Sequence, residues 1–198
     1  MWRADGIDLF PARRRELNPA FIKAMHPKTE IKPQLASIEK ILDSGWVGQT
    51  KIHGHRAQIH IHADAVKDPV AYTRQGSIHK KLLPPEIIKE FRRILRLEEG
   101  WTAIDSEWLK NENKLFIFDV LKLNDKVLGR MTYPERWKLL PRSYISRYIQ
   151  TLPLLHNTAK CLEVLNAPEE YIEGLVFKSL NSVGFKDTAI IRCRKRPA

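Results

Sequence analysis

The stretch Trp46-Val47-Gly48-Gln49-Thr50-Lys51-Ile52-His53-Gly54-His55-Arg56 sets one lysine between an apolar lead-in and a glycine. The residues before Gly54 favour a strand, and the alternation from Ala57 to His62 favours a second strand after a tight turn. Lys51 would then lie at a strand end and face a cleft. A lone lysine is usually a surface residue, so its role has to be argued from its neighbours.

The composition indicates a globular protein with a polyanionic partner. The 198 residues suffice for one large domain or two small ones, and we expect one. Lys and Arg total 34 against 23 for Asp and Glu, which gives a formal net charge of +11. Such an excess favours nucleic acid as a partner. The basic residues gather at Arg13–Arg15, at Arg92, Arg93 and Arg96, and at residues 192–196.

The sequence gives no sign of a membrane or of export. No apolar run is long enough to span a bilayer, and the N-terminus lacks the apolar core of a secretory signal. Cys161 and Cys193 have no CxxC partner and fit a reducing compartment. We therefore expect a cytoplasmic protein with no membrane partner, and a monomer.

Periodicity predicts an α+β domain dominated by antiparallel sheet. We expect one domain over residues 1–198, with an irregular basic lead-in at 1–36 and the core at 37–198. Helices are predicted at 35–42, from Pro84-Pro85 onward, from the capping box at Thr132 to about Leu140, and near Ser143–Gln150. Further strands are predicted at 70–76, 101–109, 114–121, 173–178 and 189–194.

Two carboxylates lie on one face of the strand predicted at 101–109. Alternation puts Asp105 and Glu107 on the same side, beside apolar neighbours. Buried carboxylates require partners, so we expect either cations or a metal ion next to them. The histidines at 53, 55, 60 and 62 suggest zinc at first sight, but no cysteine or carboxylate completes a site at the usual spacing, and we expect them on strand surfaces.

Six motifs follow one another along the chain. They are Lys51-x-x-Gly54-x-Arg56, Arg74-x-Gly76, Asp105-x-Glu107, Phe116-x-Phe118-Asp119, Glu173-Gly174-x-x-x-Lys178 and the basic pair Arg192 and Arg194. In this order they resemble the covalent nucleotidyltransferase superfamily of ATP-dependent DNA ligases, RNA ligases and mRNA capping enzymes. The resemblance runs from about Trp46 to Arg194. It implies a ligase adenylation domain with antiparallel sheets flanked by helices, and we expect no C-terminal OB-fold.

The resemblance also implies roles for the motif residues. Lys51 would attack the α-phosphate of ATP and carry AMP as a phosphoramidate. Nearby cations favour the neutral amine that this step needs. The remaining roles are ribose or metal binding for Glu107 and Glu173, adenine stacking for Phe118 with Phe116 as the second candidate, ribose or phosphate contacts for Arg56 and Arg74, and nucleotide binding for Lys178, Arg192 and Arg194.

The motifs depart from the DNA ligase pattern at two places. His53 stands where DNA ligases have the aspartate of KxDG, and it is similar to the KxHG of one branch of RNA ligases. Arg192 and Arg194 stand where the family has Lys-x-Lys, with Lys195 as the alternative. Arginine keeps the charge and binds phosphate in a bidentate manner, but it cannot lose its proton.

These features lead to one functional hypothesis with two rivals. We expect an ATP-dependent polynucleotide ligase that uses Mg²⁺, or Mn²⁺, and seals nicked duplex nucleic acid, with DNA favoured over RNA. The first rival is an RNA ligase, which His53 favours. The second is a non-catalytic nucleic-acid-binding module on a degenerate ligase fold, which the arginines at 192 and 194 favour.

Overall fold

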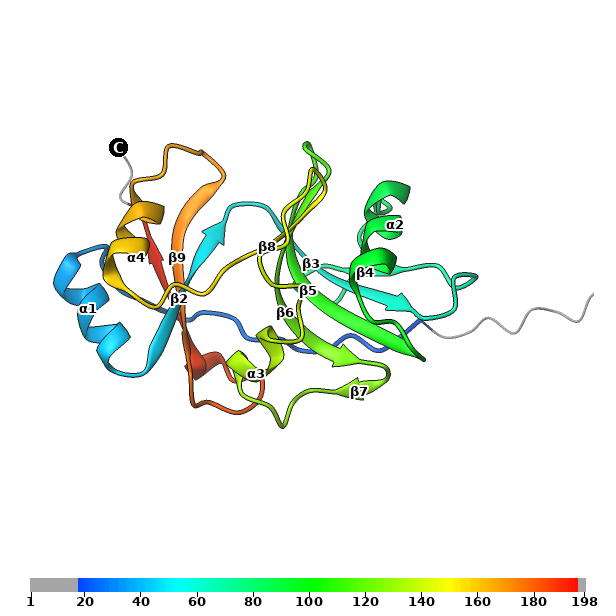
Figure 1. Cartoon of the computed structure of the whole chain (residues 1–198), viewed down its shortest axis with the longest axis horizontal. Coiled ribbons are helices and arrows are strands. Elements are labelled where there is room, and N and C mark those ends of the chain that lie inside the picture. The colour runs from blue at the N-terminus through cyan, green and yellow to red at the C-terminus, as the bar shows by residue number, and fades with distance from the viewer. Residues whose placement is uncertain (1–17, 196–198) are drawn as a thin grey trace, which may run out of the picture.

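The structure is a computed structural model that describes residues 18–195, so the arginines at 13–15 and Arg196 lie outside the described residues. Two sheets face each other across the middle of this part of the chain (Figure 1). The four-stranded sheet has the order β1 (Thr29–Glu30), β10 (Ile190–Arg194), β9 (Ile172–Ser179), β2 (Trp46–Ile52). The other sheet has the order β4 (Val70–Tyr72), β3 (His55–His62), β5 (Trp101–Leu109), β6 (Lys114–Leu123), β7 (Lys126–Val127), and β8 (Ile149–Thr151) pairs with β6. Apart from the β1–β10 and β6–β8 pairs, neighbouring strands are antiparallel, which confirms the predicted α+β class.

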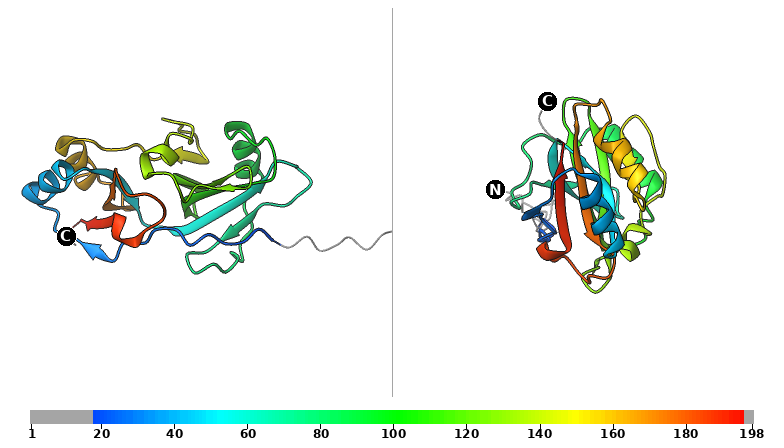
Figure 2. Two further views of the ribbon diagram at one scale, coloured as in Figure 1. Left: turned by 90° about the horizontal axis from the view of Figure 1, so that it is seen from below. Right: turned by 90° about the vertical axis from the view of Figure 1, so that its left-hand side faces the viewer.

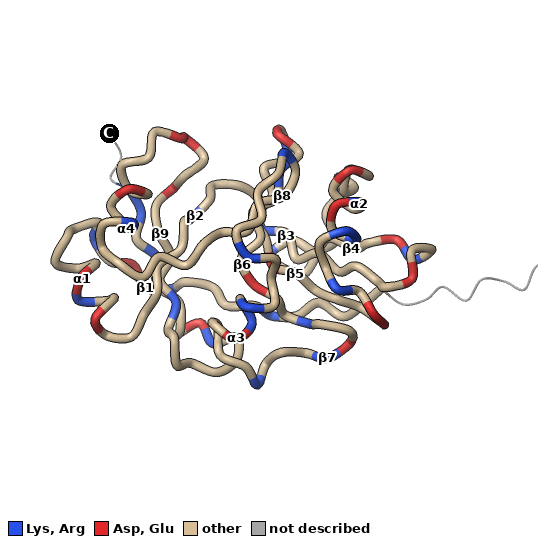
Figure 3. Tube along the Cα trace, in the orientation of Figure 1, with Lys and Arg blue, Asp and Glu red and all other residues tan. Residues whose placement is uncertain are grey.

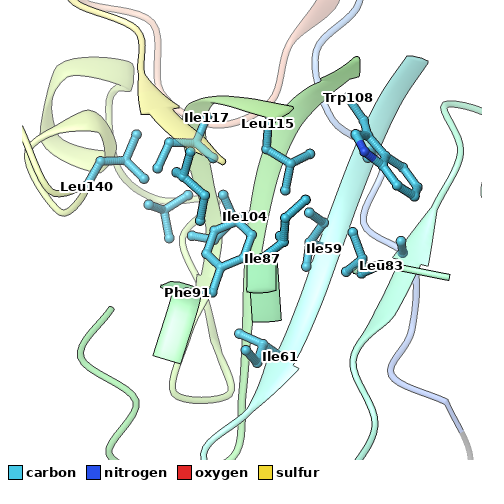
Figure 4. Close-up of a cluster of buried hydrophobic side chains, with 14 of the residues drawn as sticks. Ile59, Ile61, Leu83, Ile87, Phe91, Ile104, Trp108, Leu115, Ile117 and Leu140 are labelled. Carbon is cyan, nitrogen blue, oxygen red and sulfur yellow. The ribbon is translucent and has the colours of Figure 1, made fainter. Parts of the chain in front are cut away.

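Helices pack on each sheet. The α1 helix (Leu35–Asp43) and the α4 helix (Thr158–Leu165) lie together on the four-stranded sheet, where Ile38 and Cys161 are fully buried. The α2 helix (Pro85–Ile94) lies on the six-stranded sheet, and α3 (Tyr133–Trp137) lies beside β6. Figure 4 shows Ile87 and Phe91 of α2 among isoleucines of β3 and β5, which is the apolar face predicted for this helix.

The two strands around Lys51 exist, but they belong to different sheets. The β2 strand pairs with β9, whereas β3 pairs with β4 and β5. Gly54 lies where the chain passes from one sheet to the other. A side chain there would meet the Trp108 carbonyl oxygen at 3.0 Å and Glu107 Cγ at 3.1 Å, so glycine permits a close passage of the backbone. The predicted turn is therefore the junction of the two sheets.

Residues 18–34, which we call the strap, connect the two sheets on one side of the molecule (Figure 2). Buried polar side chains of the six-stranded sheet hold its first part. Gln58 accepts a hydrogen bond from the Ile22 N–H and donates one to its carbonyl oxygen, at 2.9 and 2.7 Å. Tyr72 donates to the Pro19 carbonyl oxygen. The second part contributes β1, so the strap is a structural element and not only a lead-in.

One helix prediction was wrong, and another was too long. Ser143 has a positive φ, and residues 149–151 form β8 in place of the second predicted helix. Ser146 Oγ accepts hydrogen bonds from the N–H groups of Tyr148 and Ile149, so a side chain satisfies the backbone there and a turn replaces the helix. The capping box at Thr132 is confirmed, but α3 ends at Trp137, three residues before the expected end. The α4 helix was not predicted at all.

Charged side chains are spread over the molecule. Figure 3 shows Lys and Arg on both sheets and on the connecting loops. Arg92 of α2 donates to backbone carbonyl oxygens at the end of β3 and in the loop that follows, and Arg93 donates to Tyr144. None of the helices in residues 18–195 has the length and hydropathy of a membrane span.

Candidate active site

A cavity of about 290 Å³ lies between the sheets, with the strap as one wall. It collects most of the residues that the motifs singled out, although these are far apart in the sequence. The predicted residues that line it are Lys51, Arg56, Arg74, Glu107, Phe118, Glu173 and Lys178. The four-stranded sheet supplies Lys51, Glu173 and Lys178, and the six-stranded sheet supplies Arg56, Glu107 and Phe118. A ligand in the cavity would therefore contact both sheets.

Lys51 lies near the end of β2, on the edge of the cavity. Its Nζ donates a hydrogen bond to Glu173 Oε2 on β9 and forms an ion pair with it. Both side chains are about a quarter exposed, so solvent and ligands can reach the amine. Because the carboxylate accepts a proton-bearing N–H, Glu173 is placed to receive the proton that the amine must lose before it attacks an electrophile.

Gly174 brings Lys51 and Arg194 onto one row of the sheet. Lys51 pairs with Gly174, and Gly174 pairs with Arg194 on β10. Gly174 has a φ of 146°, and a Cβ there would lie 2.3 Å from the Cys193 carbonyl oxygen. Only glycine tolerates this conformation and this contact. The row therefore carries no side chain between the lysine and the arginine.

Arg56 is held inside the protein by Asp105. Its Nε donates to Asp105 Oδ1 at 2.9 Å, its Nη2 donates to Asp105 Oδ2, and its Nη1 donates to the Met25 carbonyl oxygen at 2.7 Å. Burial opposes the charge of Arg56, but Asp105 outweighs it and raises the pKa of the guanidinium. The carboxylate that was expected to need a cation thus has one. Arg56 therefore lines the cavity, but its Nε, Nη1 and Nη2 groups already donate hydrogen bonds to Asp105 and Met25.

Glu107 faces the cavity and, among the described residues, forms no ion pair like that of Asp105, although the Gly54 backbone donates a hydrogen bond to its carboxyl group. Burial raises its pKa to about 7, and the nearby charges of Arg56 and Lys51 oppose this rise only in part. A carboxyl group with this pKa changes its charge near neutral pH. Ionisation of Glu107 would be favoured by a cation or by hydrogen-bond donors of a ligand, as expected of a ligand-binding residue in a cavity.

The raised pKa of Glu107 predicts a pH-dependent stability. The folded pKa of about 7 exceeds the ordinary value of 4.5, so the folded state holds this proton more tightly than the unfolded state. The resulting stabilisation is complete below about pH 4.5 and is lost as the pH rises to 7. Glu107→Gln has no ionisable group at this position and does not lose this stabilisation. As the pH rises across that range, its free energy of unfolding should therefore increase relative to that of the unchanged protein, by up to about 1.4 kcal/mol per pH unit. Urea unfolding at a series of pH values measures it, and a constant difference between the two proteins would contradict the assignment.

A β-bulge sets Phe118 and Asp119 on the cavity together. Ser106 pairs with Ile117, but its neighbour Asp105 pairs with Asp119, so Phe118 is an extra residue in β6. The bulge interrupts the regular alternation of side chains, and both Phe118 and Asp119 line the cavity. Phe116 is buried to 98% and packs near Tyr171. Of the two candidate aromatic residues, Phe118 is the one that a ligand in the cavity can reach.

Lys178 forms the inner end of the cavity. Its Nζ donates to Gln49 Oε1 at 3.0 Å and lies 4.0 Å from the centre of the Tyr133 ring and 4.8 Å from that of Phe118. Burial lowers the pKa of Lys178 to about 7, with Asp119 and Asp105 opposing the shift. The cavity therefore contains two amines, of which Lys178 is almost completely enclosed and Lys51 is accessible.

Arg192 and Arg194 do not line the cavity. Both donate to the carboxylate of Glu30 on β1, Arg192 through Nε at 2.9 Å and Arg194 through Nε and Nη2 at 2.8 Å each. Arg194 borders a second, more open hollow that shares His53 and Glu173 with the cavity. The predicted phosphate-binding arginines thus lie next to the cavity, where they contact a carboxylate of the strap.

Sequence reasoning missed several residues of the cavity wall. Met25, His26 and Pro27 of the strap line it, in a segment expected to be irregular. No local pattern signals this position, because distant hydrogen bonds hold the strap in place. Gln49 was also missed, although two-residue alternation along β2 puts it on the same face as Lys51. Its amide accepts from Tyr133 Oη at 2.9 Å and donates to the Leu152 carbonyl oxygen at 3.0 Å.

The histidines do not form a metal site. Across residues 18–195, no group of three or more His, Cys, Asp or Glu side chains is arranged to hold a metal ion. His53 is 78% exposed, and its Nδ1 lies 3.7 Å from Glu173 Oε2. His60 was expected on the surface, but it is fully buried and its Nε2 lies 2.8 Å from Gln58 Oε1. The polar neighbour allows an imidazole in the core, and burial lowers its pKa to about 4.

Comparison with solved structures identifies the fold. The chain is similar to mycobacterial DNA ligase D complexed with ATP and MES, with a TM-score of 0.54 at 15% identity over 86% of this chain and 60% of that one. It is also similar to the ligase domain of LigD from M. tuberculosis, with a TM-score of 0.56 at 16% identity over 84% of this chain and 58% of that one. A third similar structure, Pmar-Lig_Pre, gives a TM-score of 0.55 at 17% identity over 87% of this chain and 46% of that one.

The fold is therefore that of ligase nucleotidyltransferase domains, as the order of motifs predicted. The chain spans about 60% of the length of the two mycobacterial structures. No protein-family model and no curated protein sequence matches it.

Proposed function

We propose that this protein is an ATP-dependent polynucleotide ligase that seals 5′-phosphate/3′-hydroxyl nicks through a lysyl-AMP intermediate on Lys51. One observation carries the proposal: the accessible amine of Lys51 lies in a cavity with the glutamates, the aromatic ring and the cations of the ligase motifs. The similarity of the fold to a DNA ligase complexed with ATP supports ATP as the substrate of this cavity.

In the first step Lys51 attacks the α-phosphorus of ATP. A nitrogen–phosphorus bond forms, the bond to the bridging oxygen breaks, and pyrophosphate leaves with the electron pair. The amine loses a proton, which Glu173 is placed to accept through the existing hydrogen bond. The reaction depends on position and on charge more than on covalent help, and the cations along the cavity match the charge of the phosphates.

The cavity fits the rest of the nucleotide. The ring of Phe118 offers a surface on which adenine can stack, and Glu107 can accept hydrogen bonds from ribose hydroxyls once it is ionised. Lys178 lies beside the same ring, at the enclosed end of the cavity. The adenine end of ATP would thus enter the enclosed end, and the phosphates would lie toward Lys51 and the opening.

Two carboxylates fit a divalent cation at the phosphates. Glu107 and Glu173 line one cavity with Lys51, and Mg²⁺ is usually held by one or two carboxylates together with substrate phosphates. When bound there, Mg²⁺ or Mn²⁺ would neutralise charge on the phosphate oxygens. Glu173 binds the amine of Lys51 through Oε2, so its other oxygen, Oε1, would be the one to hold the ion.

The later steps return the lysine to its starting state. A 5′-phosphate oxygen of the nicked strand attacks the phosphorus of lysyl-AMP, and the nitrogen–phosphorus bond breaks. The 3′-hydroxyl then attacks the 5′-phosphorus, AMP leaves, and the strand is joined. Arg74 lies in a turn at the rim of the cavity and also borders a neighbouring pocket with Lys23 and Lys28, so its charge suits the 5′-phosphate.

DNA is the substrate that we propose, and RNA is the second candidate because of His53. Its exposed imidazole lies beside Glu173, at the place where DNA ligases carry aspartate. The test compares sealing of a nicked duplex in three forms, all DNA, all RNA and hybrid, at one salt concentration. Faster sealing of the DNA nick is expected. Sealing of the RNA nick alone would contradict the DNA assignment and leave the ligase chemistry intact.

A further inference from the structure

One carboxylate neutralises part of the charge next to the cavity. Glu30 of the strap accepts hydrogen bonds from both Arg192 and Arg194, and within residues 18–195 the two guanidiniums donate to no other acceptor. The hydrogen bond from Arg194, with that from Arg192, lowers the pKa of Glu30 to about 2, although partial burial opposes the shift. Glu30 is therefore ionised at neutral pH, and the group of three side chains carries a net charge of +1.

The two arginines share the sheet face that lines the cavity. Arg194 lies on the row of Lys51 and Gly174, and Arg192 lies on the row of Gln49 and Val176. Gly174 has no side chain, and backbone atoms of Cys193 and Arg194 fill the position that its Cβ would take, so no side chain of this row separates Lys51 from Arg194. A group of phosphates that extends away from Lys51 along this row would meet the two arginines, at the position where Glu30 now binds them.

The contacts of Glu30 can be exchanged without unfolding the strap. The side chains are 33% exposed for Glu30 and Arg192 and 47% exposed for Arg194, and ion pairs of this kind contribute little to stability. The backbone of the strap is held separately, because the Ile31 N–H donates to the Arg192 carbonyl oxygen at 2.9 Å. Phosphate offers arginine a stronger, bidentate partner with more charge than one carboxylate.

We propose that Glu30 competes with the phosphates of ATP, and of the pyrophosphate product, for Arg192 and Arg194. This inference rests on the proposed function, because it places the terminal phosphates along the row from Lys51 to Arg194. The competition limits how tightly the site holds pyrophosphate, which must leave before nucleic acid can react. Glu30 thereby lowers the affinity of the site for pyrophosphate and speeds the release of this product.

Binding of inorganic pyrophosphate tests the competition without any catalytic step. Calorimetric titration of the folded protein compares the unchanged chain with Glu30→Gln, which keeps the size of the side chain and removes its charge. We expect a dissociation constant about three- to tenfold lower for Glu30→Gln, with the gain shrinking as salt is added. The matched control is Glu163→Gln, which removes an exposed carboxylate paired with Lys160 on α4 and changes the net charge equally.

The outcomes separate this inference from the ligase assignment. Glu163→Gln should change the dissociation constant by less than about twofold, and Glu30→Gln should have no effect when Arg192 and Arg194 are both alanine. Unchanged or weaker pyrophosphate binding by Glu30→Gln would overturn the competition, as would the absence of binding by either protein. Covalent labelling of Lys51 by ATP is measured separately, so normal labelling with unchanged pyrophosphate affinity overturns only the role of Glu30.

Discussion

Replacing Lys51 with arginine is expected to reduce nick sealing by at least about 10⁴-fold, the scale on which loss of a covalent nucleophile acts. Arginine keeps the positive charge and can still pair with Glu173, but its guanidinium does not lose a proton under physiological conditions and cannot form the bond to phosphorus. The loss should therefore be chemical and not structural. Sealing of a nicked duplex under saturating ATP measures it, together with thermal unfolding, which should be nearly unchanged.

Two controls show whether the loss belongs to the first step. Lys40→Arg makes the same change on the exposed face of α1, away from the cavity, and should seal at the original rate. A nick that already carries AMP on its 5′-phosphate needs no nucleophilic lysine, so Lys51→Arg should still seal it in the absence of ATP. Sealing of the ordinary nick by Lys51→Arg, at a rate near that of the unchanged protein, would remove Lys51 from the chemistry.

Replacing Arg136 with methionine is expected to lower the free energy of unfolding by about 3–5 kcal/mol. Arg136 is completely buried, and its Nε and Nη2 donate to the two oxygens of Asp119 at 2.9 Å each. Its Nη1 donates to the Met131 carbonyl oxygen, so one side chain connects α3, β6 and the loop before α3. Methionine leaves the Asp119 carboxylate buried without this partner, and that desolvated charge is the main cost.

Urea unfolding measures this loss. Arg147→Met removes an exposed arginine from the loop before β8 and should change the stability by less than about 0.5 kcal/mol. Arg136→Met combined with Asp119→Asn should recover part of the loss, because no unpaired charge remains in the core. A loss below about 1 kcal/mol for Arg136→Met alone would contradict the assigned role of the ion pair.

Strands and helices with a clear hydrophobic periodicity could be predicted from the sequence, but the pairing of the strands could not. The strand with Lys51 and the strand with Glu173 follow from their apolar and β-branched residues, yet nothing local says that they pair with each other while β3 joins another sheet. Pairing depends on contacts between residues far apart in sequence. The sequence therefore predicts a strand, a tight turn at Gly54 and a second strand, but not that the two strands lie in different sheets.

Helix predictions failed where side chains compete with the backbone for hydrogen bonds, whereas α4 has a start signal in its sequence. The segment with Tyr144 and Tyr148 has spaced aromatic residues, but the hydroxyl of Ser146 and the pairing of β8 with β6 favour a turn and a strand. In contrast, α4 carries a readable start, because Asn157 accepts a hydrogen bond from the Lys160 N–H as an N-cap. Its apolar residues recur at helical spacing, so the sequence contained the signal.

The motif residues that line the cavity could be predicted from the sequence. The strap could not, because contacts with distant residues hold it in place. Lys51, Glu107 and Glu173 are brought into one cavity, in agreement with the order of motifs. The strap became visible only in the structure, since the side chains of Gln58, Tyr72 and Arg56 hold it by donating hydrogen bonds to its backbone carbonyl oxygens. The position of Glu30 against the two arginines depends on this placement.

The most direct test is the site of covalent adenylylation. The unchanged protein is incubated with ATP labelled at the α-phosphorus and with Mg²⁺, kept at alkaline pH to preserve a phosphoramidate, digested, and mapped by mass spectrometry. We expect one adenylate per chain, labile in acid, on the peptide that contains Lys51. No adduct, or an adduct on Lys178, the second amine of the cavity, would contradict it.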